Sequence, residues 1–149
     1  MRAKSGFTLV EILIVVVILG ILAAIVIPQF TDASTEAKTS SLCSDLQTVR
    51  SQLELYKIQH NDAIPAPEAG GATWNRMTQY TDIDGNINAA KTAVFKYGPY
   101  LQKVPTNPFN DDATIDVDGA TAGDDAGGWN FNTTTGEFYA DDSAAHAAL

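Results

Sequence analysis

The sequence predicts an α+β protein, in which a long N-terminal helix packs its second half on a small antiparallel β-sheet head. An apolar stretch from Phe7 to Ile27 leads into a helical spacing of apolar residues that continues to Tyr56. Beyond Asn61 the pattern changes to short alternating segments separated by Pro, Gly and Asn, which is typical of strands and turns. A chain of 149 residues has room for one small domain and this long helix.

The first part of the expected helix, residues 7–30, is long and apolar enough to cross a membrane. At about 1.5 Å per residue, Phe7–Ile27 spans about 31 Å as a helix. The preceding segment, residues 1–6, is short and carries Arg2 and Lys4. The positive-inside rule keeps such a basic flank in the cytoplasm, so we expect a single pass with the C-terminal part outside.

Glu11 is the only charged residue in this apolar stretch. A carboxylate within a membrane helix is costly unless it is paired, so its presence indicates a function. No Lys, Arg or His lies between Phe7 and Gln29 to pair with it. A cut after Gly6 would give Phe7 a free α-amino group, which could pair with Glu11 of the same or a neighbouring chain. The alternative is a carboxylate that snorkels to the membrane surface.

The N-terminal residues read Gly6-Phe-Thr-Leu-Val-Glu11, followed by an apolar run that ends at Phe30. This segment resembles the class III signal of type IV pilins and type II secretion pseudopilins. The resemblance implies a prepilin peptidase that cuts between Gly6 and Phe7 and N-methylates Phe7, and a Glu11 that pairs with another subunit's N-terminus. It also implies a homopolymer, minor pilins or pseudopilins and an inner-membrane assembly platform as partners.

Pro28 lies within the expected helix and predicts a kink, because proline removes one backbone hydrogen bond and clashes with the preceding turn. The family resemblance implies that this segment can become non-helical in filaments, which makes Pro28 a second candidate assembly residue. A static kink at the membrane boundary is the alternative, and the sequence leaves both open.

The helix continues to about Gln59, since apolar residues recur at helical spacing on one face. The predicted organisation is a cleaved leader (1–6), a transmembrane and polymerisation helix (7–30), its amphipathic continuation (31–60) and an α+β head (61–149). We expect Cys43 to be a small buried hydrophobe and His60 to be a cap or surface residue. The residues of the apolar face are Leu46, Val49, Leu53 and Tyr56.

Four short segments of the head are predicted to form strands. Residues 93–97 are rich in β-formers, and Ile115 and Val117 alternate with polar residues. Residues 129–131 and 137–139 flank a loop that ends in Gly136, which indicates a hairpin. The final residues, 143–149, are expected to be a loose tail.

Composition excludes several classes of function. The chain has 18 acidic and 9 basic residues, so it lacks the electrostatic attraction that nucleic-acid binding requires. One cysteine and two histidines cannot supply a Cys/His zinc cluster. Residues 61–149 contain no nucleophile–base–acid grouping, so we expect no enzyme. A membrane-anchored module that binds calcium or carbohydrate remains an alternative, but it leaves Glu11 unexplained.

The segment from Gly98 to Phe109 resembles a stretch of major type II pseudopilins, with Asn107 in place of an acid and Phe109 in place of tryptophan. The predicted function is therefore a structural subunit, most like the major pseudopilin of a type II secretion system, which forms a periplasmic pseudopilus for protein export. The alternative is the major subunit of a type IV surface pilus, used for adhesion, twitching motility or DNA uptake.

The loop of residues 110–128, here called the aspartate loop, is a candidate calcium site. Major pseudopilins hold the equivalent loop with calcium, a hard cation that prefers carboxylate and carbonyl oxygens. The alternative is a solvated acidic loop. The candidate ligands are Asp111, Asp112, Asp116, Asp118, Asp124 and Asp125.

Overall fold

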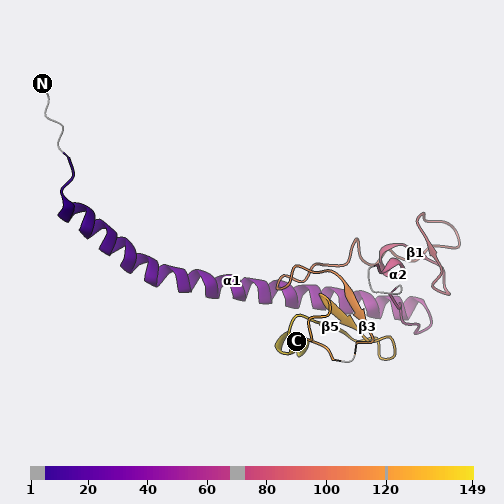
Figure 1. Ribbon diagram of the computed structural model, residues 1–149. Coiled ribbons are helices and arrows are strands. Elements are labelled where there is room, and N and C mark those ends of the chain that lie inside the picture. The colour runs from indigo at the N-terminus through magenta and orange to yellow at the C-terminus, as the bar shows by residue number, and fades with distance from the viewer. Residues whose placement is uncertain (1–5, 68–72, 120) are drawn as a thin grey trace, which may run out of the picture. The chain divides into compact units, whose positions relative to one another are not determined.

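The computed structural model describes residues 6–67, 73–119 and 121–149. One long helix, α1 (Leu9–Gln59), is followed by α2 (Asn75–Thr78) and two short strands, β1 (Tyr80–Thr81) and β2 (Ile87–Asn88) (Figure 1). The chain then forms β3 (Ile115–Val117), β4 (Trp129–Phe131), β5 (Phe138–Ala140) and α3 (Ala144–Ala147). It divides into two units, Met1–Ala37 and Lys38–Leu149, and α1 contributes to both.

The N-terminal unit contains the first half of α1, whose large apolar side chains are all exposed. The helix remains α-helical through Pro28, although proline provides no amide for the carbonyl one turn earlier. One turn further on, the Thr31 hydroxyl donates to the Ile27 carbonyl oxygen at 3.2 Å. In the single chain, Pro28 is therefore accommodated within a continuous helix.

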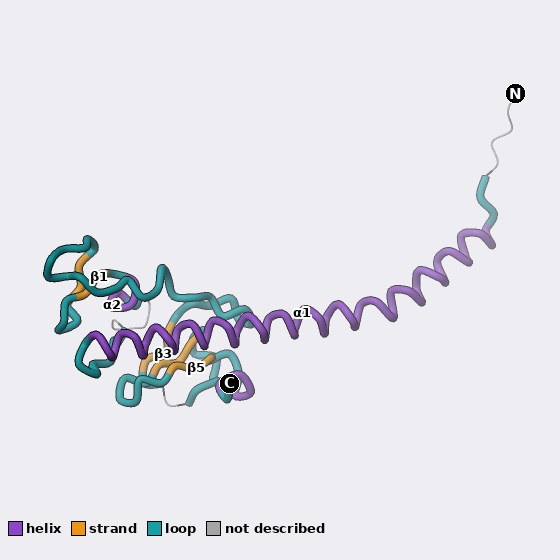
Figure 2. Tube along the Cα trace, turned by 180° about the vertical axis from the view of Figure 1, so that it is seen from behind, coloured by secondary structure: helices purple, strands orange, loops and turns teal. Residues whose placement is uncertain are grey.

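The C-terminal unit is built on the second half of α1, with the two sheets packed around it (Figure 2). The predicted apolar face is confirmed, because Leu46, Val49, Leu53 and Tyr56 are each only 1% exposed. The aromatic residues that complete the core lie directly before α2 and in the last two strands: Trp74, Trp129, Phe131 and Phe138.

The three-stranded sheet has the order β3-β4-β5. The predicted hairpin is confirmed, since β4 pairs antiparallel with β5 and Phe131 lies opposite Phe138. Gly136 closes the hairpin with a φ of 76°, a conformation that glycine adopts without steric cost. The expectation of a purely antiparallel sheet is wrong, because β3 runs parallel to β4. The separate β1–β2 pair is antiparallel.

Other local expectations are corrected by packing. Residues 93–97 form no strand, and only Tyr97 makes an isolated bridge, to Thr81. Cys43 is exposed rather than buried. His60 is buried, because its ring stacks on Tyr56 and both of its nitrogens have hydrogen-bond partners.

The C-terminal segment is ordered rather than a loose tail. Ser143 caps α3 through its side-chain oxygen, which accepts the amide hydrogen of His146 at 3.3 Å. The His146 ring in turn contacts the Asp142 carboxylate. These local contacts give the segment a helical turn that its alanine-rich composition alone does not indicate.

Candidate assembly site and metal centre

Thr8 and Glu11 form a reciprocal capping arrangement at the start of α1. The Thr8 amide and hydroxyl both donate to the same Glu11 carboxylate oxygen, at 2.7 and 2.8 Å. The Glu11 amide donates back to the Thr8 hydroxyl oxygen at 3.3 Å. This Thr-x-x-Glu pattern is a capping box, which explains why α1 begins at Leu9 rather than at Phe7. The sequence interpretation overlooked Thr8, although its spacing from Glu11 was a visible signal.

The capping box holds one carboxylate oxygen of Glu11, so the side chain is already oriented at the helix start. Around it the surface is apolar: Phe7 is 84% and Leu9 82% exposed, and the exposed apolar residues continue to Phe30. Gly6 and Phe7, the predicted cleavage pair, lie in an exposed segment without regular secondary structure before the helix. Together these features place an accessible backbone and a carboxylate at the same end of a bare apolar helix.

The structure brings together two of the six aspartates proposed to bind calcium. Asp116 and Asp124 lie with Asp141, and the three carboxylates offer oxygens within 4.8 Å of one another. Asp141 was not among the predicted ligands because it lies beyond the aspartate loop, directly after β5. The β4–β5 register gives the physical reason: Trp129 pairs with Ala140, which brings Asp141 to the end of the loop.

The other four aspartates have different roles. Asp112 accepts two hydrogen bonds from Thr114, and Asp118 accepts two from Thr133. Asp125 accepts one from the Asn110 side chain, and Asp111 is exposed. The carboxylates of Asp112 and Asp118 therefore organise turns, and the pKa of each is lowered by these hydrogen bonds.

Asp141 fixes the backbone of the aspartate loop at the candidate metal site. It is fully buried, and its two carboxylate oxygens accept the amides of Gly123 and Gly127 at 2.7 and 3.1 Å. Burial raises the pKa of Asp141, and the nearby charges of Asp124 and Asp116 raise it further, against the opposing effect of the two amides. Such a group of carboxylates repels itself unless a cation or a proton is shared among them.

The donor set fits calcium. Three carboxylates are hard oxygen ligands, which suit Ca²⁺ rather than zinc or copper. The loop also approaches closely: a side-chain carbon at Gly119 would lie 1.7 Å from an Asp116 carboxylate oxygen. The Asp116 carboxylate thus lies in space that glycine leaves open and that the Cβ of any other residue at position 119 would occupy.

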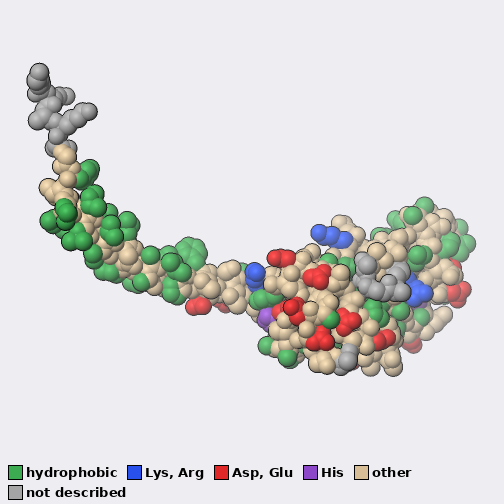
Figure 3. All heavy atoms as spheres, viewed as in Figure 1, with side chains coloured by type: hydrophobic (Ala, Val, Ile, Leu, Met, Phe, Trp, Pro, Cys, Tyr) green, Lys and Arg blue, Asp and Glu red, His purple; other side chains and the backbone are tan. Residues whose placement is uncertain are grey.

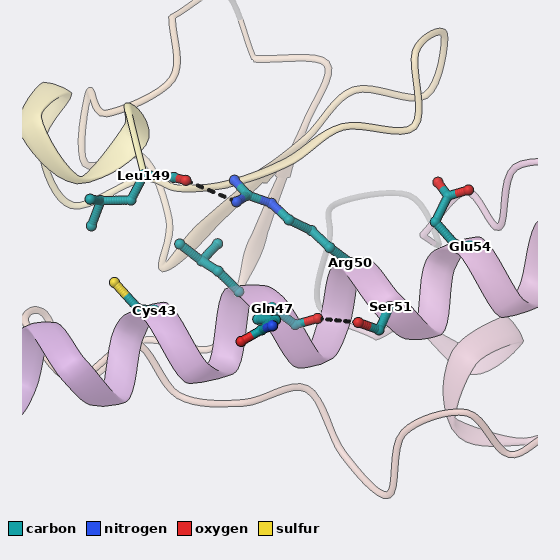
Figure 4. Close-up of a pocket in the computed structure, with 7 residues that line it drawn as sticks. Cys43, Gln47, Arg50, Ser51, Glu54 and Leu149 are labelled. Carbon is teal, nitrogen blue, oxygen red and sulfur yellow. Dashed lines mark hydrogen bonds between the residues drawn. The ribbon is translucent and has the colours of Figure 1, made fainter.

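A surface cavity of about 410 Å³ lies along α1, and its lining, among the residues that the structure describes, carries no catalytic arrangement (Figure 4). Arg50 crosses it and donates to the carbonyl oxygens of Leu149 and Phe138, at 3.0 Å each. Cys43 lies at its edge with its thiol exposed. Arg50 therefore joins α1 to β5 and to the C-terminal segment, which is a structural role.

Comparison with known proteins decides the family. Residues 1–27 match the model of the prokaryotic N-terminal methylation motif. The chain is 35% identical to type II secretion system core protein G of Pseudomonas aeruginosa over 72% of this chain and 70% of the relative. It is 30% identical to the core protein G of Aeromonas hydrophila over 87% of this chain and 94% of the relative. The chain belongs to the family of type IV pilins and type II secretion pseudopilins.

A surface-pilus protein is also among the relatives of this pilin-family chain. The type IV narrow pilus major component PilA5 of Thermus thermophilus is 35% identical over 66% of this chain and 91% of the relative. No solved structure matches the chain at a significant level. Like other members of this family, the chain is a membrane-anchored structural subunit, and α1 contains a stretch long and apolar enough to cross a membrane.

The segment that resembles major pseudopilins, Gly98–Phe109, fastens the sheet of this pilin-family chain. The Asn107 amide donates to the Gly128 carbonyl oxygen at 2.9 Å and to the Asp142 carboxylate at 2.8 Å. The Trp129 indole donates to the Pro105 carbonyl oxygen at 2.8 Å. Asparagine fits this position because its amide donates to the Asp142 carboxylate, which an acid in its place would repel.

Proposed function

We propose that this chain is the major pseudopilin of a type II secretion system and polymerises into a periplasmic pseudopilus that drives protein export. The observation that carries the proposal is the Glu11 carboxylate, held by Thr8 within an apolar helix surface that has no basic residue between Phe7 and Gln29. The apolar side chains of this surface need lipid around them, and the Glu11 carboxylate needs a cationic partner that arrives later. The similarity to core protein G over most of both chains supports the secretion assignment.

The assembly mechanism follows from the order of events at the N-terminus. In the precursor, Glu11 accepts hydrogen bonds from Thr8, and a carboxyl in lipid can also stay protonated at little cost. Cleavage between Gly6 and Phe7 creates an ammonium group, which methylation of Phe7 leaves cationic. That cation pairs with Glu11 of a neighbouring copy, and the exposed apolar residues of the two helices then cover each other.

The proposed organisation assigns residues 1–6 to the leader, 7–30 to the membrane and polymerisation helix, 31–60 to its continuation and 61–149 to the head. The subunit is inserted once into the inner membrane with its head outside the cytoplasm. Its partners are further copies of itself, minor pseudopilins, the prepilin peptidase and the inner-membrane assembly platform. We infer neither enzymatic activity nor nucleic-acid binding.

Calcium at Asp116, Asp124 and Asp141 forms the second part of the proposal. A bound ion would supply the positive charge that three neighbouring carboxylates need. Asp141 holds the amides of Gly123 and Gly127, so the ion would fix the loop to the end of β5. This staple suits a small C-terminal unit that has no disulfide within residues 38–149.

Glu11→Gln tests the proposed function in a strain whose only copy of this subunit is the variant. Glutamine can still accept from the Thr8 amide, so the start of α1 is preserved while the charge is lost. Losing one member of a buried charge pair costs about 3–5 kcal/mol, so filament yield should fall by more than tenfold. Intact-mass measurement should still find cleaved chains that begin with Phe7.

Thr8→Ser is the matched control, because serine retains the hydroxyl and should keep normal filament yield. Normal filaments from the Glu11→Gln strain would show that the charge does not recruit the incoming subunit. A surface pilus is the second candidate, supported by the similarity to PilA5. Shearing intact cells separates the two functions: the protein should remain with the cells if it is a pseudopilin and appear in released fibres if it is a pilin.

A further inference from the structure

One exposed segment of the C-terminal unit differs in charge from the rest of the chain. Residues 85–110 contain no Asp or Glu, although the chain has 18 acidic residues. Within this range, Lys91 and Lys96 are exposed, and neither forms an ion pair with any residue that the structure describes. Lys96 lies 5.1 Å from the centroid of the adjacent Tyr97 ring. Residues 91–96 are here called the lysine segment.

The lysine segment is also apolar and uncovered. Val94, between the two lysines, is 62% exposed, and Ile83 and Ile87 of the neighbouring hairpin are 41% and 42% exposed. Figure 3 shows hydrophobic side chains gathered over the end of the C-terminal unit that carries β1. A surface that combines exposed apolar groups with unpaired charges of one sign fits a partner with the opposite charge.

The complementary charge lies elsewhere on the same unit. Asp111 and Asp125 of the aspartate loop are exposed, lie outside the proposed calcium cluster and have no basic partner among the described residues. Figures 1 and 2 place β1 and α2 on one side of the second half of α1, and β3 and β5 on the other. No ion pair joins the two surfaces within one chain, as far as the described residues go.

We propose that the lysine segment of one copy binds the aspartate loop of the next copy, with Val94 covered at the contact. This inference rests on the proposed filament function and names the surfaces through which successive C-terminal units meet. The two surfaces are different, so the contact is heterologous. A heterologous contact leaves one free surface on each copy, so it does not close as a symmetric dimer and propagates into an open filament where the rotation between copies does not close a ring.

Zero-length cross-linking of filaments of the full chain tests the contact directly. A carbodiimide joins a lysine amine to a carboxylate only when the two touch. We expect a cross-linked dimer in which mass spectrometry finds an amide between Lys91 or Lys96 and Asp111 or Asp125. Links from these lysines solely to acidic residues outside the aspartate loop, or solely within one chain, would overturn the proposal.

Charge variants provide the second readout. Lys91→Asp combined with Lys96→Asp should lower filament yield about tenfold, as expected from losing two exposed ion pairs, while the amount of cleaved subunit in the membrane is unchanged. Asp111→Asn with Asp125→Asn should also lower the yield. All four changes together should cause no further loss than the lysine changes alone, because residues in contact are not additive.

Asp62→Asn is the matched control, since Asp62 is exposed and shares the left-handed backbone of Asp111 and Asp125, with φ values of 63°, 55° and 64°. It should leave filament yield unchanged. Filaments that form normally with the lysine changes overturn this contact alone. A wild-type chain that forms no filament overturns the proposed function, and the contact with it.

Discussion

At the scale of single residues, Glu11 and Asn107 each make hydrogen bonds that depend on the charge of the side chain. Glu11 sits at the start of an apolar helix, and Thr8 satisfies one of its oxygens before any partner arrives. Asn107 is buried and uses both amide hydrogens, one toward a carbonyl and one toward Asp142. At either position, exchanging an amide for a carboxylate or the reverse changes the interaction: Glu11→Gln removes a charge, and Asn107→Asp replaces a hydrogen bond to Asp142 with repulsion.

Asn107→Asp should destabilise the C-terminal unit markedly. The aspartate loses both donated hydrogen bonds and places a second buried carboxylate beside Asp142. Each unsatisfied buried group costs about 1–3 kcal/mol, so we expect a loss of about 2–5 kcal/mol in urea unfolding of the full chain in detergent. Asn61→Asp, at an exposed position, is the control and should unfold like the wild type. Equal stability of the two variants would contradict the role of Asn107.

At the scale of elements, the regular pattern of α1 and the β4–β5 hairpin could be predicted because both depend on nearby residues. The apolar spacing from Leu46 to Tyr56 specifies a helix face, and the Asn132–Gly136 loop specifies a hairpin. The parallel pairing of β3 with β4 could not be predicted, since it depends on how the long aspartate loop returns. Residues 93–97 have β-forming side chains but no neighbouring strand, apart from the single bridge at Tyr97.

The same distinction applies to the candidate metal centre. Asp116 and Asp124 could be proposed from loop composition, whereas Asp141 enters only through strand register. The other four aspartates of the loop were equally good candidates by composition, but in the structure they lie outside the cluster, in local hydrogen bonds or exposed on the surface. The composition of the loop therefore predicted where the site lies, but the pairing of β4 with β5 determines which aspartates form it.

The turn between β1 and β2 gives a pH prediction. The Asn86 side-chain amide donates to Asp82, as do the amides of Asn86 and Asp84, and these bonds lower the pKa of Asp82. A lowered pKa stabilises the fold at pH values above the ordinary value of about 4, and this stabilisation is lost as the pH falls through the lowered pKa. Asp82→Ala should therefore lower the melting temperature at pH 7.

The difference between Asp82→Ala and the wild type should shrink progressively below pH 4, where the wild-type carboxylate also becomes protonated. Thermal melts from pH 7 to pH 2 measure it. Asp84→Ala is the control, because Asp84 contributes its backbone amide to the turn, and alanine retains that amide. A difference that stays constant over this pH range would mean that Asp82 acts through shape and not through charge.

At the scale of the whole molecule, the chain combines an uncovered apolar helix with a C-terminal unit whose core is closed by a few aromatic residues. The large apolar side chains in the first half of α1 are exposed in the part of the chain that the structure describes, so we expect this half to depend on lipid or on other copies for its stability. The C-terminal unit depends instead on its own packing and, in our proposal, on an ion at the aspartate loop. The two parts are therefore expected to respond to different treatments.

Removal of calcium should destabilise the C-terminal unit without dissociating the chain from membranes. An ion present at 100 times its dissociation constant adds about 2.7 kcal/mol to the unfolding free energy. The full chain in detergent should thus melt at a lower temperature in chelator and recover when calcium is restored. Asp141→Asn should abolish this response, whereas Asp111→Asn, outside the cluster, should retain it. A wild-type melting temperature that is the same with and without chelator would show that the aspartate loop does not bind calcium.

The order of the core residues along the chain has a consequence for when the C-terminal unit can fold. The buried face of α1 is made early, while Trp129, Phe131 and Phe138, which cover it, lie close to the C-terminal end of the sequence. In an orientation that sends the C-terminal unit across the membrane after α1, this face emerges long before its cover. In that orientation nearly the entire chain must cross the membrane before folding can finish, and a stalled chain would expose the apolar face of α1 to chaperones and proteases.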